Sequence, residues 1–158
     1  MTRWPGCVRP VALLPVLLAA SLAHAACLAI ASNPDGASLL RVALPPDEAV
    51  FRVTYRHSVT RTAVEERYRV DGEAIVETEI RFEQHGPGLP TEPDAGGRWV
   101  HRDGRFIVSR NRRFSHVVMR VDADAQPTLA AGADAIDLAQ WGNRALVLRA
   151  LRDPCARP

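Results

Sequence analysis

Apolar and polar side chains alternate along residues 50–83 in the way that is typical of β-strands. Successive side chains of a strand point to opposite faces, so the pattern separates a buried face from a solvent-facing one. The buried face of the first strand would hold Phe51, Val53, Tyr55, His57 and Val59, and that of the second Thr62, Val64, Glu66, Tyr68 and Val70. A third segment alternates as well, with Ala74, Val76, Thr78, Ile80 and Phe82 on one face.

Short turn signals divide the rest of the chain into similar segments. Asp71-Gly72 and Asp103-Gly104 each stand between two alternating runs, which is a strong hairpin signal. Only the Ala-rich stretch at residues 129–139 is ambiguous between helix and strand. We therefore expect an all-β fold, an antiparallel β-sandwich or partly open barrel of about nine or ten short strands.

The first 25 residues have the pattern of a secretory signal peptide. Arg3 and Arg9 precede an apolar run of 13 residues, Val11–Ala23, and Ala23-His24-Ala25 supplies the small residues of a cleavage site. Cleavage there leaves residues 26–158 as one all-β domain in the periplasm or outside the cell. No later segment resembles a membrane span, so we expect no integral membrane segment after cleavage.

Charge gives no sign of a nucleic-acid partner. The formal net charge of +2 disappears with the two signal-peptide arginines, and basic and aromatic residues do not interleave as they do in nucleic-acid-binding proteins. Cleavage also removes Cys7 and leaves Cys27 and Cys155, an even count that predicts a disulfide in an exported protein. A lipid anchor on Cys27 is the alternative, although His24 stands where a lipoprotein signal has an aliphatic residue.

The candidate chemistry lies on the alternating hairpin. Tyr55, His57 and Glu66 occupy positions where the pattern calls for Val or Leu, and buried polar groups need partners. A two-residue loop would place Tyr55 opposite Glu66, whereas a four-residue loop would place His57 there, and either register lets the three side chains meet. Three readings stay open: a structural hydrogen-bond network, a ligand pocket, or an acid–base pair. Ser58 points away from His57, which argues against a serine nucleophile.

The loop Gly86-Pro87-Gly88-Leu89-Pro90 is the second candidate. Its glycines, Gly86 and Gly88, could expose backbone N–H groups to an anion, but a shaped turn is the simpler reading. The arginines at 110, 112 and 113 are interpreted as solvated. The histidines at 85, 101 and 116 lack the spacing of metal ligands, so we predict no metal and no cofactor.

As a set, these motifs resemble the small exported proteins of domain-of-unknown-function family 1850. The resemblance rests on Tyr55-x-His57-Ser58-Val59, Thr62-x-Val64-x-Glu66-x-Tyr68, Phe82 and the Gly86-x-Gly88-Leu89-Pro90 loop, and it extends from about Cys27 to Leu151. Members of that family are encoded beside, or fused to, tripartite ATP-independent periplasmic (TRAP) transporters that use a TAXI-type solute-binding protein. The family supplies no catalytic residues, so its motif positions mark only where a shared site would lie.

We therefore expect a non-enzymatic periplasmic accessory or ligand-handling module, whose partners are TRAP transporter subunits or a small solute. The candidate binding residues are Tyr55, His57, Glu66, Tyr68, Gly86 and Gly88. One alternative is an exported hydrolase or isomerase that uses His57 and Glu66. Another is a purely structural β-domain.

Overall fold

Eleven β-strands and two short 3-10 helices make up the computed structural model, which describes residues 26–45, 47–151 and 155. The signal peptide expected at residues 1–25 lies outside these described residues. The strands are β1 (Cys27–Asn33), β2 (Ser38–Ala43), β3 (Val50–Arg56), β4 (Ala63–Asp71), β5 (Ala74–Phe82), β6 (Trp99–Arg102), β7 (Arg105–Phe114), β8 (Val117–Arg120), β9 (Thr128–Ala131), β10 (Asp134–Asp137) and β11 (Ala145–Leu151). The helices are η1 (Ala123–Ala125) and η2 (Leu138–Trp141).

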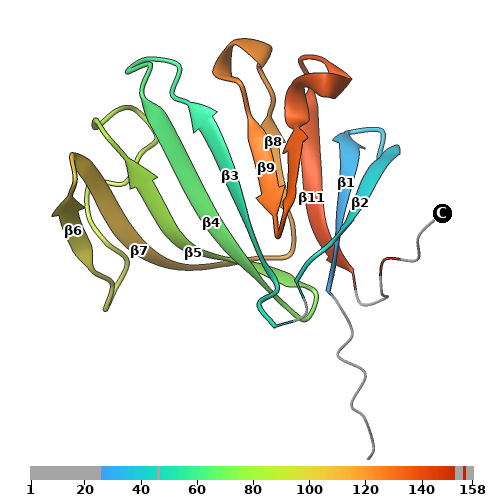
Figure 1. Cartoon of the computed structure of the whole chain (residues 1–158), viewed down its shortest axis with the longest axis horizontal. Coiled ribbons are helices and arrows are strands. Elements are labelled where there is room, and N and C mark those ends of the chain that lie inside the picture. The colour runs from blue at the N-terminus through green and yellow to red at the C-terminus, as the bar shows by residue number, and fades with distance from the viewer. Residues whose placement is uncertain (1–25, 46, 152–154, 156–158) are drawn as a thin grey trace, which may run out of the picture.

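The strands form two antiparallel sheets, which confirms the expected all-β sandwich and excludes a closed barrel. The smaller sheet has the order β2-β1-β11-β8, and the larger one has the order β10-β9-β3-β4-β5-β7-β6. In Figure 1 the strands from β3 to β6 curve around one side of the molecule, and β11, β1 and β2 lie on the other. The strand count exceeds the expected one because the ambiguous Ala-rich stretch forms the short hairpin β9–β10 before η2.

Both Asp-Gly pairs are hairpin turns, as their flanking alternation predicts. Asp71-Gly72 joins β4 to β5, and Asp103-Gly104 joins β6 to β7. Asp103 and Gly104 have φ angles of 51° and 74°, the left-handed backbone that this short turn requires. These turns fix the register of the hairpins that they close.

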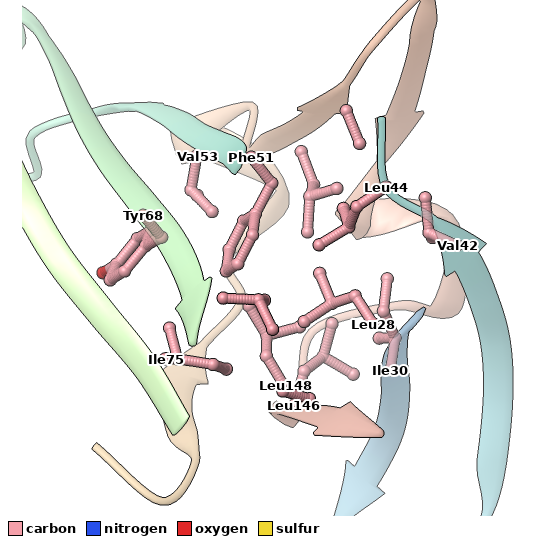
Figure 2. Close-up of a cluster of buried hydrophobic side chains, with 14 of the residues drawn as sticks. Leu28, Ile30, Val42, Leu44, Phe51, Val53, Tyr68, Ile75, Leu146 and Leu148 are labelled. Atoms are coloured by element: carbon pink, nitrogen blue, oxygen red, sulfur yellow. The ribbon is translucent and has the colours of Figure 1, made fainter. Parts of the chain in front are cut away.

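The main core lies between the two sheets. Leu28, Ile30, Val42, Leu44, Leu146 and Leu148 of the smaller sheet pack against Phe51, Val53, Tyr68 and Ile75 of the larger one (Figure 2). Fully burying one such aliphatic or aromatic side chain contributes about 1.5–3 kcal/mol. A second, smaller cluster of Val64, Ile80, Phe82 and Val108 lies further along the larger sheet, where Leu89 of the 83–98 connection covers it.

A β-bulge in β5 changes which residues face the core. The pairing of β4 with β5 shifts between Arg67 and Tyr68, so that Thr78 has no partner on β4. As a result Ile75 packs in the main core while Ile80 and Phe82 pack in the second cluster, all on one face of the sheet. The expected single face of Ala74, Val76, Thr78, Ile80 and Phe82 is therefore wrong, because the extra residue reverses the alternation halfway along the strand.

A disulfide joins Cys27 to Cys155 and confirms the pairing expected from the cysteine count. The two Cα atoms are 5.1 Å apart, although 128 positions separate them in the sequence. The bridge anchors β1 to the chain that follows β11, its antiparallel neighbour. In the described part of the chain, no helix has the length and apolar character that a membrane crossing requires.

We predict that the double variant Cys27→Ser, Cys155→Ser loses about 5 kcal/mol of unfolding free energy, the loop-closure value for a loop of this length. Urea unfolding of the oxidised protein and of the variant measures the difference. Non-reducing mass spectrometry of the protein produced in an oxidising compartment should show no free thiol. Two cysteines that alkylate without reductant, or a diacylglycerol adduct on Cys27, would contradict the pairing.

Candidate functional site

A group of polar side chains lies between the two apolar clusters of the larger sheet. On the inner face, Glu66 of β4 stands between Val53 of β3 and Ile80 of β5. In the neighbouring row, Tyr68 stands beside Glu77, and Glu77 stands beside Arg112 of β7. The inner face thus changes from apolar to charged in the middle of the sheet.

The carboxylate of Glu66 is held between two tyrosine hydroxyls. The hydroxyl of Tyr55 donates to Oε1 of Glu66 at 2.9 Å, and that of Tyr68 donates to Oε2 at 2.6 Å. Alternation places all three side chains on one face, as the sequence predicts, with Tyr55 diagonally across from Glu66 and Tyr68 two residues further along β4. The hydrogen bond from Tyr55 links β3 to β4, whereas that from Tyr68 lies within β4.

Both tyrosines pack their rings against the main core and donate their hydroxyls to the carboxylate of Glu66. The ring of Tyr68 stacks on Phe51 with centroids 5.0 Å apart, while its hydroxyl points away from the labelled core side chains (Figure 2). Burial raises the pKa of both phenols well above their usual value, and the charge and hydrogen bond of Glu66 raise it further. The two hydroxyls therefore stay protonated as donors to the carboxylate.

A second set of charges adjoins this group. The side chain of Glu77 is 9 % exposed and lies 3.6 Å from Nε of Arg110 and 4.0 Å from a terminal nitrogen of Arg112. Arg110 also pairs with Asp94 at 3.2 Å. Burial raises the pKa of Glu77, as does the charge of Glu66, while the two arginines act in the opposite direction.

The sequence analysis missed Glu77 and misjudged Arg110. Simple alternation puts Glu77 on the solvent side of β5, but the bulge at Thr78 turns it inward. Arg110 was interpreted as solvated, whereas its side chain is only 10 % exposed and lies where the pairing of β5 with β7 is irregular. Neither bulge has a glycine or proline signal in the sequence, so pattern alone could not locate them.

Two hollows meet at these side chains. The first, of about 440 Å³, has Tyr55, Glu66, Tyr68, Glu77 and Arg112 on one wall and residues 116–122 on another. The second, of about 610 Å³, lies under the loop from Gly88 to Ala95 and also touches Glu66, Glu77, Arg110 and Arg112. We name them the strand hollow and the loop hollow. Their shared wall is Glu66, Glu77 and Arg112.

His57 does not join this group. Strand β3 ends at Arg56, and Tyr55 pairs with Val64 while Val53 pairs with Glu66, so neither register expected for the hairpin is correct. His57 lies four residues beyond Val53, about 13 Å along the strand direction from the Glu66 row. The four-residue turn 58–61, closed by a hydrogen bond from the Arg61 N–H to the His57 carbonyl, sets this register.

Instead, His57 forms hydrogen bonds that connect the turn between β3 and β4 to the 83–98 connection. Its Nδ1 accepts from the N–H groups of Val59 and Thr60 at 3.2 Å each, so its Nε2 carries the proton and donates to the Pro87 carbonyl at 3.0 Å. Gly86 is needed at this contact, because a Cβ there would lie 2.7 Å from the imidazole Cε1. The candidate residues thus separate into two groups. His57 and Gly86 form a structural contact, whereas Tyr55, Glu66 and Tyr68 lie on the hollow walls. Gly88 lies on the wall of the loop hollow.

The described residues contain no group of three or more His, Cys, Asp or Glu side chains placed to hold a metal ion. Glu66 and Glu77 are the only acidic residues common to both hollow walls. Their neighbours are tyrosine hydroxyls and arginines, which donate hydrogen bonds.

Comparison with known protein families gives a match to one described as a domain of unknown function, DUF1850, over residues 51–138. The chain belongs to this family. The DUF1850 match contains all six candidate residues as well as Glu77, Arg110 and Arg112, whereas Cys27 and Cys155 lie outside it. Searches of curated proteins and of solved structures gave no match.

We predict that Glu66→Ala lowers the free energy of unfolding by about 1–3 kcal/mol, because it leaves the part-buried hydroxyls of Tyr55 and Tyr68 without their acceptor. Glu66→Gln should cost less, since its carbonyl oxygen still accepts one of the two hydrogen bonds. Urea unfolding measures both. Glu65→Ala is the matched control, because Glu65 faces outward beside Arg67 and should change stability by no more than about 0.5 kcal/mol. Equal stability of the Glu66→Ala and Glu65→Ala variants would refute the network.

Proposed function

We propose that this protein is a non-enzymatic, exported ligand-handling module that serves a TAXI-type TRAP transporter. The observation that carries the ligand-handling part is the position of Glu66, a part-buried carboxylate on the shared wall of two hollows. A carboxylate kept only for structure would be closed off by its partners. Here the two tyrosines fix its position and leave it facing open space.

The size and lining of the hollows support this proposal. Small-molecule sites commonly have volumes of about 300–1,000 Å³, with a few polar groups set among apolar and aromatic walls. Both hollows fall in this range, at about 440 and 610 Å³. Rings of Tyr55 and Tyr68 provide apolar walls in the strand hollow, and Ile80 and Leu89 do so in the loop hollow.

The alternative hydrolase or isomerase is less well supported. That mechanism requires His57 and Glu66 within hydrogen-bond reach of one another or of one substrate atom. The register instead separates them by four residues, and both ring nitrogens of His57 are occupied by backbone groups. This separation supports binding without chemistry over an acid–base pair of His57 and Glu66.

Export and transporter association rest on different grounds. The signal-peptide pattern of residues 1–25 and the Cys27–Cys155 disulfide suit a protein that works in an oxidising compartment. The link to a TRAP transporter comes from the family resemblance alone. In this proposal the module binds the transported solute, or a related one, next to the transporter.

We predict that deleting the gene lowers uptake of the transporter's solute at limiting concentration, while the affinity of the solute-binding protein stays unchanged. Radiolabelled uptake in the deletion strain measures the effect. Complementation with the wild type or with Glu65→Gln should restore uptake, whereas Glu66→Gln should not, although it is exported in equal amount. Unchanged uptake after deletion would contradict the transporter role, and full rescue by Glu66→Gln would favour the purely structural alternative.

A further inference from the structure

The loop hollow contains a negative charge that no cation of the protein neutralises. Within the described ranges, Glu66 forms hydrogen bonds only with the neutral hydroxyls of Tyr55 and Tyr68, and no Arg or His side chain forms an ion pair with it. The two arginines nearby are directed to other carboxylates. Arg110 lies between Glu77 and Asp94, and Arg112 approaches Glu77. A part-buried carboxylate in this position is set to receive a cation.

The same hollow contains two arginines whose hydrogen-bonding capacity is not filled. The side chain of Arg110 is nine-tenths buried, and its Nε is the one buried side-chain nitrogen or oxygen without a hydrogen-bond partner among the residues that the structure describes. Glu77 is 3.6 Å from it, which is too far for a hydrogen bond. That nitrogen is itself buried, so an acceptor supplied from outside would meet Arg112, whose side chain is 54 % exposed and whose ion pair with Glu77 is 4.0 Å long.

The Glu66 carboxylate and the arginine side chains of β7 are a short distance apart. Glu66 belongs to β4 and Arg110 and Arg112 belong to β7, with β5 between them, so the strands are about 10 Å apart. The long arginine side chains reach back across β5 to Glu77, which shortens the gap between the opposite charges. Arg112 is 54 % exposed and can turn toward a ligand in either hollow.

We propose that the loop hollow binds a small zwitterion, a solute that carries an ammonium group and a carboxylate a few atoms apart. Glu66 receives the ammonium group, and the exposed Arg112 on the same wall receives the carboxylate. This inference rests on the proposed ligand-handling function and specifies its solute class. A ligand with only one of the two charges would leave either Glu66 or Arg112 without a partner of opposite charge.

Four probes with the same carbon chain length test the solute class. They are 4-aminobutyrate and 2-aminobutyrate, which carry both charges, butylammonium, which carries only the positive one, and butyrate, which carries only the negative one. Isothermal titration calorimetry with the purified, disulfide-bonded protein measures each affinity. We expect at least one zwitterion to bind about tenfold or more tightly than either single-charge probe, the effect of one charge-assisted contact.

Matched variants identify the binding groups. Glu66→Gln and Arg112→Gln should each weaken binding of the zwitterion about tenfold. Glu65→Gln and Arg113→Gln change the neighbouring residues on the outer face, where they pair with Arg67 and Asp71, and should leave its affinity within about twofold. Circular dichroism of each variant checks that it is folded.

Three results would overturn the inference: a single-charge probe that binds as tightly as both zwitterions, a Glu66→Gln variant with unchanged affinity, or no binding of any probe. These outcomes can be told apart from failure of the proposed function. If uptake still depends on Glu66 while no zwitterion is preferred, the solute class is wrong and the function stands. If uptake does not depend on the gene, the transporter role is wrong whatever the protein binds.

Discussion

The hydrogen bonding of one carboxylate by two tyrosines determines how the inner face of the larger sheet is organised. Burying Glu66 without donors would cost several kcal/mol, and the hydroxyls of Tyr55 and Tyr68 supply them from β3 and β4. Because the rings of these tyrosines pack into the apolar clusters, the carboxylate can sit at the boundary of the core without a cation beside it. Among the described residues, the negative charge of Glu66 therefore has no cationic partner.

The rest of the site follows from the unequal size of the two sheets. The smaller sheet covers the part of the larger one that carries Phe51, Val53 and Ile75, and Leu89 covers the cluster around Phe82. Between the smaller sheet and Leu89, part of the inner face is not covered and forms the walls of the two hollows. The bulge at Thr78 directs Glu77 toward this uncovered part. The arrangement brings negative and positive groups from three strands to one strip, which is the basis of the binding proposal.

Alternation and turn chemistry predicted the all-β architecture, the Asp-Gly hairpins and the shared face of Tyr55, Glu66 and Tyr68, and the even cysteine count predicted the disulfide. Their success has a physical cause, because a period of two and a tight turn are local properties. His57 was misplaced because the turn 58–61 sets a register in which Val53, and not Tyr55 or His57, stands opposite Glu66. Glu77 and Arg110 were missed because a bulge reverses alternation, and bulges depend on pairing between strands that single-strand patterns do not contain.

The central claim is that Glu66 is a charged acceptor held by two buried phenols, and the titration of the phenols tests it most directly. Tyr55 and Tyr68 are the only two tyrosines of the chain, so the ultraviolet absorbance of tyrosinate reports on them alone. The account predicts no tyrosinate at about pH 11 while circular dichroism still shows folded protein, although a free phenol has a pKa of about 10. In the Glu66→Gln variant ionisation should begin at lower pH, because the neighbouring charge is gone. Half-ionisation of both tyrosines near pH 10 in the folded wild type would contradict the account.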